Sequence, residues 1–80
     1  MEHRIKIYST PSCPYCHMLK EYLGGKGFAY EDINVAEDLQ ARQEMVEKSG
    51  QMGVPVSDID GNIVVGFDKE RVNELLNISE

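Results

Sequence analysis

The chain has 80 residues, which is enough for one domain over residues 1–80 but leaves no room for a second hydrophobic core. Its 14 acidic and 8 basic residues give a formal net charge of −6, which disfavours binding to nucleic acids or anionic membranes. The 2 cysteines are too few for a disulfide scaffold, so the fold must rest on ordinary packing.

The N-terminal half predicts a strand, a helix and a second strand. Isoleucines alternate with charged residues over residues 3–9, as in a half-buried strand. Pro14 suits the first position of a helix, and Gly24-Gly25 suits its end. Residues 28–33 then read as the second strand. No apolar run reaches membrane-spanning length and no signal-peptide core precedes the first strand, so we expect a cytoplasmic protein.

A second helix is expected after the second strand. Asn34 with Glu37 three residues later resembles a capping box, and Gly50 stops the pattern after residues 48–49. The predicted apolar stripe of this helix is modest and consists of Leu39, Met45 and Val46.

The C-terminal part predicts a hairpin and a last helix. Asp60-Gly61 separates two apolar runs, residues 54–59 and 62–65, and is a strong two-residue hairpin signal. Asp68 can cap a helix that carries Val72, Leu75 and Leu76. The resulting order, β-α-β-α-β-β-α, predicts a small α/β fold in which helices cover both faces of the sheet.

The two cysteines lie where the first strand ends and the first helix begins, in the sequence Cys13-Pro14-Tyr15-Cys16. Helix N-terminal N–H groups and the positive end of the dipole favour a thiolate at Cys13, while Cys16, one turn into the helix, should point inward. This placement predicts attack by Cys13 on a disulfide and resolution of the mixed disulfide by Cys16. Tyr15 is expected to be exposed beside Cys13.

Other interpretations of the cysteine pair remain open. A structural disulfide closing so small a loop would stabilise little. A metal site would need four ligands, and the chain offers only the two cysteines with His3 and His17 unless a dimer supplies the rest. The run from Cys13 to His17 also fits the C-x-x-C-H pattern of c-type haem attachment. A solvated helix residue is the plainer role for His17.

Two further segments could contribute to a site. Pro55 begins a strand after Gly53-Val54, and a cis Val54-Pro55 bond would leave the Val54 N–H and C=O free to pair with an extended substrate. Gly66-Phe67-Asp68 precedes the last helix, where Asp68 and helix N–H groups could form an anion- or peptide-binding corner.

These three elements, in this order, resemble the glutaredoxins of the thioredoxin-fold superfamily over nearly the whole chain. The resemblance implies a minimal thioredoxin (glutaredoxin-like) fold, with a four-stranded mixed sheet flanked by three helices. It also implies Cys13 as nucleophile, Cys16 as resolving thiol, Pro55 in cis, and a substrate groove bounded by Tyr15, Val54 and Asp68. No cofactor is expected beyond the redox-active Cys13–Cys16 disulfide, with glutathione as a conceivable co-substrate.

Departures from glutathione-using glutaredoxins bear on the source of electrons. Thr10 and its neighbours are uncharged where those proteins usually carry Lys or Arg, and Arg42 or Lys48 would have to compensate. Gly66-Phe67 looks more like the NrdH-redoxins, which are reduced by a thioredoxin-reductase-type flavoprotein and donate electrons to ribonucleotide reductase. We therefore expect a monomeric thiol–disulfide oxidoreductase that acts on protein disulfides and is reduced by such a flavoprotein or by glutathione. The competing hypothesis is a homodimer that shares an iron–sulfur cluster or metal through Cys13.

Overall fold

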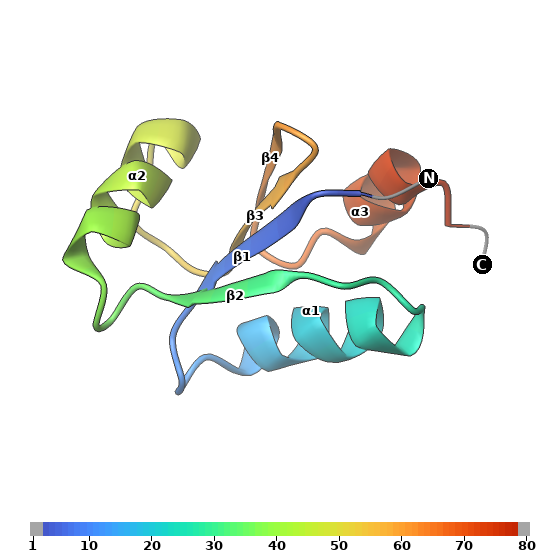
Figure 1. Cartoon of the computed structure of the whole chain (residues 1–80), viewed down its shortest axis with the longest axis horizontal. Coiled ribbons are helices and arrows are strands. Elements are labelled where there is room, and N and C mark those ends of the chain that lie inside the picture. Colours follow the sequence, from blue (N-terminus) through green and yellow to red (C-terminus); the bar gives the residue numbers. More distant parts are fainter. Residues whose placement is uncertain (1–2, 79–80) are drawn as a thin grey trace.

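A four-stranded sheet in the order β2-β1-β3-β4 forms the centre of the molecule (Figure 1). The structure is a computed structural model and describes residues 3–78. Seven elements follow one another along the chain: β1 (Ile5–Ser9), α1 (Pro14–Gly25), β2 (Glu31–Asn34), α2 (Leu39–Ser49), β3 (Val56–Ile59), β4 (Asn62–Val65) and α3 (Lys69–Leu76). This is the predicted β-α-β-α-β-β-α order.

The sheet is mixed, as predicted. β1 pairs in parallel with β2, so that Ser9 lies opposite Asn34. On its other side β1 pairs antiparallel with β3, and β3 pairs antiparallel with β4. The carboxyl ends of β1 and β2 therefore meet at one edge of the sheet, and the β1–α1 loop that carries Cys13 leaves from this edge.

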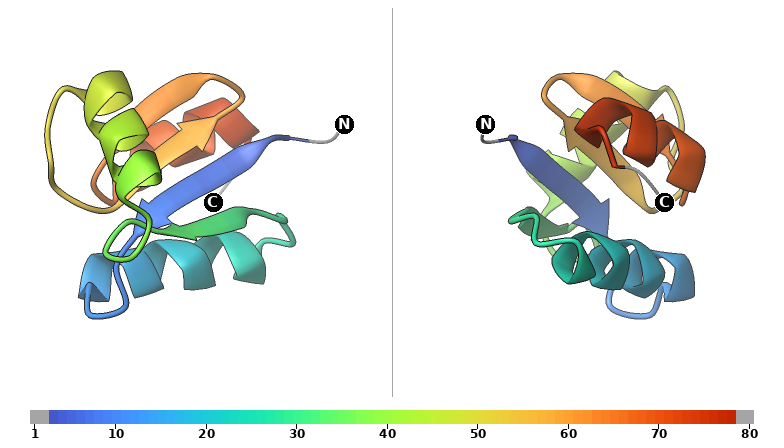
Figure 2. Two further views of the ribbon diagram at one scale, coloured as in Figure 1. Left: turned by 60° about the vertical axis from the view of Figure 1, so that its left-hand side comes forward. Right: turned by 90° about the vertical axis from the view of Figure 1, so that its right-hand side faces the viewer.

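Helices cover both faces of the sheet (Figure 2). α1 and α3 lie on one face over a core that includes Ile7, Leu19, Leu23 and Val72. α2 lies on the other face, where Met45 packs with Tyr8, Val35 and Val56. Hydrophobic burial on two faces is thus divided between two cores that share the central strands.

Turn chemistry explains most of the element boundaries. Pro14 is in the first turn of α1, where its missing N–H removes no helical hydrogen bond. Gly50 ends α2 in the left-handed conformation at φ 74°. Asp60 and Gly61 have φ angles of 52° and 91°, the two positive values that a type I′ hairpin turn requires. These predictions are confirmed.

The start of the second helix was predicted wrongly. Asn34 does not cap a helix: its side-chain oxygen accepts from the Ala36 N–H at 2.9 Å, and its carbonyl accepts from the Asp38 N–H at 3.0 Å. Asp38 is the N-cap and accepts from the Ala41 N–H at 3.0 Å. The three intervening residues form a turn that buries Val35 in the core.

Several further boundaries and one helix face differ from expectation. β1 begins at Ile5, β2 at Glu31 and β3 at Val56, all later than predicted. Leu39, placed in the apolar stripe of α2, is 71% exposed, whereas Ala41 is buried in its stead. Ala41 lies one turn before Met45, so these two residues share the buried face of α2. Within residues 3–78, no helix is long and apolar enough to cross a lipid bilayer.

Candidate active site

Cys13 is itself the N-cap residue of α1. Its backbone is extended, at φ −91° and ψ 111°, and its Sγ accepts a hydrogen bond from the Cys16 N–H at 3.2 Å. A thiol in this position meets the unpaired N–H groups and the positive end of the helix dipole. The structure therefore places the Cys13 sulfur at the positive end of the α1 dipole, the position expected from the sequence.

Cys16 lies one turn further along α1 and is fully buried. Both cysteines are free thiols in this structure, with Cys13 half-buried. Burial, followed by the hydrogen bond with Cys13, raises the pKa of the Cys16 thiol to about 11. The pair is thus asymmetric: the Cys13 sulfur is partly exposed and accepts a helix N–H, whereas the Cys16 thiol is fully buried and protonated.

The Val54-Pro55 segment lies against the reactive sulfur. The Val54-Pro55 peptide bond is cis, as expected. The Val54 carbonyl oxygen lies 3.9 Å from the Cys13 Sγ, and this is the one partner of the Val54 backbone within residues 3–78. The Val54 N–H is therefore available to an extended chain that approaches Cys13.

The corner at Gly66-Phe67-Asp68 is hydrogen bonded to the Val54-Pro55 segment. The Gly66 N–H donates to the Pro55 carbonyl at 2.8 Å, and Gly66 holds φ at 76°, which a residue with a side chain rarely adopts. Phe67 packs at a tilt against the ring of Tyr22, with centroids 5.9 Å apart. Asp68 caps α3 by accepting from the Arg71 N–H at 3.2 Å.

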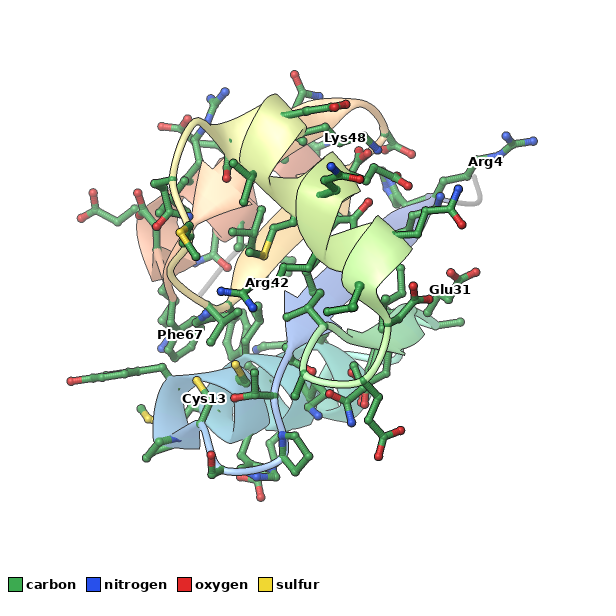
Figure 3. The ribbon with its side chains drawn as sticks, turned by 90° about the vertical axis from the view of Figure 1, so that its left-hand side faces the viewer. Arg4, Cys13, Glu31, Arg42, Lys48 and Phe67 are labelled. Carbon is green, nitrogen blue, oxygen red and sulfur yellow. The ribbon has the colours of Figure 1, made fainter. Side chains whose placement is uncertain are left out.

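The structure therefore brings together the candidate residues from three separate segments. Figure 3 shows Cys13 and Phe67 at the same end of the molecule. Tyr15, on the first turn of α1, is 62% exposed, and Met52, in the loop before Val54, is 61% exposed. Exposed apolar side chains close to a reactive thiol are suited to contact with another protein.

The two cations considered for this site have different surroundings. Lys48 forms ion pairs with Glu44 at 3.0 Å and Asp58 at 2.9 Å, and it also hydrogen bonds to Tyr8. Arg42 is exposed and has no ion pair within the described part of the chain. In Figure 3, Arg42 projects from α2 on the side of Cys13 and Phe67, while Lys48 lies at the other end of the helix. Of the two, Arg42 is thus the cation without an ion pair in residues 3–78.

The residues offered for a metal site are separated. His3 bonds through Nδ1 to the Asp60 carboxylate at 2.6 Å, next to the hairpin turn. The Nε2 of His17 lies 3.0 Å from the Pro11 carbonyl oxygen. Over residues 3–78, no group of three or more His, Cys, Asp or Glu side chains could hold a metal ion. A metal or cluster would therefore need ligands from a second molecule.

One polar cluster beneath the site was missed by the sequence reasoning. Asp32 on β2 accepts from the Ser9 hydroxyl at 2.7 Å and from the Lys20 ammonium at 3.0 Å. Burial alone would raise the pKa of Asp32, but these two hydrogen bonds lower it. Lys20 is one turn after Cys16 on α1, and this i, i+4 spacing is the only sequence signal that could have pointed to it.

A half-buried thiol at the N-terminus of a helix, facing a cis-proline loop in this sheet topology, defines a small thioredoxin-fold dithiol protein. The glutaredoxin family model matches residues 5–64. A glutaredoxin-like 8.6 kDa protein encoded in a rubredoxin operon of Clostridium pasteurianum is 54% identical over 72 residues, covering 90% of this chain and 96% of the relative. Glutaredoxin 3 of Escherichia coli is 34% identical over 64 residues, covering 80% of this chain and 77% of that protein.

Among solved structures, the glutaredoxin-like NrdH-redoxin from Escherichia coli superimposes with a TM-score of 0.79 at 32% identity. The match covers 90% of this chain and 93% of that structure. The chain therefore belongs to the glutaredoxin family of the thioredoxin fold, and it is a thiol–disulfide oxidoreductase.

Proposed function

We propose that the protein reduces protein disulfides through both of its cysteines. The Cys13 thiolate attacks one sulfur of a client disulfide, forming a Cys13–client disulfide and releasing the other client sulfur as a thiolate. Cys16 then loses its proton and attacks the Cys13 sulfur, so that the Cys13–Cys16 disulfide forms and the second client sulfur leaves as a thiolate. The client takes up two electrons and two protons, and the protein is oxidised by the same amount.

The observation that carries this proposal is the asymmetry of the pair. The Cys13 sulfur is half-buried and accepts the Cys16 N–H at 3.2 Å, while the Cys16 thiol is fully buried with its pKa raised. Only a sulfur that a client can reach can begin the exchange, and the buried thiol is left to complete it within the same helical turn.

We further propose that the client lies as an extended segment across the Val54 backbone, between Tyr15 and Asp68. The free Val54 N–H supplies a main-chain hydrogen bond, as in other cases where a peptide adds to an extended segment. The exposed Tyr15 ring supplies apolar contact area beside the disulfide under attack. Backbone pairing of this kind accepts many sequences, which suits a carrier with more than one client.

The reductant is either a thioredoxin-reductase-type flavoprotein or glutathione, and we favour the flavoprotein. The residues between β1 and Cys13, which include Thr10, carry no positive charge. Of Arg42 and Lys48, Arg42 is the one without an ion pair in the described residues, and a guanidinium suits a glutathione carboxylate. The NrdH-redoxin from Escherichia coli, described by its thioredoxin-like activity profile, supports the same choice. Ribonucleotide reductase is a candidate client.

Two measurements test these proposals. Insulin reduction by the wild type, Cys13→Ser and Cys16→Ser tests the roles of the cysteines, and full activity of Cys13→Ser would disprove them. Reduction of the oxidised protein by glutathione and, separately, by a thioredoxin reductase tests the electron source. We expect the flavoprotein to be faster, and Arg42→Gln to slow reduction by glutathione only. Faster reduction by glutathione would reverse our choice of reductant.

A further inference from the structure

A lysine one helical turn after the buried Cys16 is held by a side-chain network that joins three elements. Lys20 of α1 donates to Asp32 of β2 at 3.0 Å, and Asp32 also accepts from Ser9 of β1 at 2.7 Å. The Lys20 side chain is only 16% exposed, an unusual degree of burial for lysine. Figure 1 shows α1 running alongside β2, which brings the helix and this strand into contact.

Lys20 and Cys16 occupy the same face of α1 because they are four residues apart. Burial has the largest effect on the Cys16 thiol and raises its pKa, and the Lys20 charge has a smaller effect in the opposite direction. The two oxygens of Asp32 accept from Ser9 and Lys20, so the Lys20 ammonium is held between α1 and β2 rather than free to move into solvent.

We propose that Lys20 is a positioning residue for the second half of the exchange, in which its ammonium stabilises the Cys16 thiolate as that thiolate forms. This inference rests on the proposed dithiol function. It assigns the Lys20–Asp32 pair a role in releasing the client, and it assigns the pair no role in the first attack by Cys13.

The chemistry of the step shows where a fixed cation acts. In the mixed disulfide the Cys13 sulfur is bonded to the client and carries no charge. The Cys16 S–H must then give its proton to solvent, and the resulting thiolate attacks the Cys13 sulfur while the Cys13–client bond breaks. The Lys20 ammonium acts on Cys16 through its charge alone and takes no part in the proton transfer.

Few other groups act on Cys16. Cys13 and Lys20 are the charged or titratable groups of its own helix that do so, and the β1–α1 loop contributes a backbone hydrogen bond from Thr10. From the sheet, Asp32 of β2 accepts a hydrogen bond from Lys20 and thereby holds this cation in place. Removing the Lys20 charge therefore removes the one cation that favours the Cys16 thiolate in the described part of the chain.

The two halves of the exchange can be timed separately with Ellman's reagent. Cys13 takes up one thionitrobenzoate group and releases the first coloured thiolate, and attack by Cys16 releases the second. The variants to compare by stopped flow are Lys20→Met, Lys20→Arg and Lys26→Met. Lys26 lies just beyond the end of α1, so Lys26→Met removes the same charge away from the cysteines. Unfolding curves for each variant show that it is folded.

We expect Lys20→Met to slow the second phase by about three- to tenfold at neutral pH, as for one partly compensated charge a helical turn away. Its pH–rate profile should move to higher pH by about 0.5–1. The first phase should not change, Lys20→Arg should restore the second phase, and Lys26→Met should match the wild type.

Equal second-phase rates in Lys20→Met and Lys26→Met would overturn the inference. So would an equal slowing of both phases, since Lys20 would then act on Cys13. The dithiol function itself fails by a different result: a first phase that persists in Cys13→Ser. The two failures are thus distinguishable in one experiment.

Discussion

Substitution of Gly66 by alanine tests whether the corner beside Pro55 depends on backbone conformation. Gly66 holds φ at 76°, and an added Cβ would meet no heavy atom within 4 Å. The cost of Gly66→Ala is therefore conformational rather than steric, about 1–2 kcal/mol for a residue with a side chain in the left-handed region. This energy would raise the fraction of unfolded protein about 5- to 30-fold and lower the melting temperature by roughly 4–16 °C.

Two other glycines provide matched controls. Gly27 has φ at 83° with the same free space around a Cβ, but it lies after α1, far along the chain from the cysteines. Gly24 is inside α1 without a positive φ, and its Cβ would also meet nothing. Gly27→Ala should lose about the same 1–2 kcal/mol as Gly66→Ala, whereas Gly24→Ala should gain about 0.5–1 kcal/mol.

Insulin-reduction activity should distinguish the Gly66→Ala variant from the Gly27→Ala variant. The Gly66 N–H donates to the Pro55 carbonyl at 2.8 Å, so relief of strain at Gly66 moves the corner relative to the client-binding segment. We expect Gly66→Ala to lower kcat/KM for insulin reduction below the transition temperature, and Gly27→Ala to leave it unchanged. Unfolding in denaturant and insulin turbidity provide the readouts. Wild-type stability in Gly66→Ala, or a loss of stability in Gly24→Ala, would refute the reasoning.

Three further predictions concern stability. Leu19→Ala, at a fully buried position, should cost about 2–5 kcal/mol in denaturant unfolding, while Leu39→Ala, at a 71% exposed one, should stay within about 0.5 kcal/mol; equal losses would contradict the assigned helix faces. Tyr8→Phe should cost about 1–2 kcal/mol, because the buried Tyr8 hydroxyl donates to the Glu44 carboxylate at 2.7 Å; an unchanged unfolding midpoint would show that this bond adds nothing. The pKa of Asp32 is lowered on folding, so its contribution is present above the unfolded value of about 3.9 and lost as pH falls through the folded one. The stability difference between wild type and Asp32→Asn should therefore shrink as pH falls below about 4, and a constant difference would contradict the pairing.

Turn and helix-capping residues in the sequence predicted those boundaries of the fold that depend on neighbouring residues alone. Asp60-Gly61 satisfied a turn that needs two positive φ angles, and Pro14 suited the first turn of α1. The start of α2 was not decidable in this way, because Asn34 and Asp38 are both good capping residues. The choice between them depends on burial of Val35 in the core, which is a tertiary contact.

In the candidate site, too, some features follow from neighbouring residues and others depend on tertiary contacts. The placement of Cys13 and Cys16 follows from their spacing in a predicted helix, so the asymmetry of the pair could be expected from the sequence. The contacts of Gly66 with Pro55 and of Lys20 with Asp32 could not, since each joins two segments whose relative position is set by packing. They depend on sheet register and on the position of α1 against β2, which no local pattern specifies.

The central claim is that Cys13 forms the covalent bond to the client and Cys16 breaks it. The most direct measurement is intact mass after the reduced Cys16→Ser and Cys13→Ser variants are each mixed with oxidised insulin under non-reducing conditions. We predict a stable adduct with Cys16→Ser, cleaved by dithiothreitol and mapped to Cys13, and no adduct with Cys13→Ser. An adduct of equal yield on Cys16 in the Cys13→Ser variant would contradict the account.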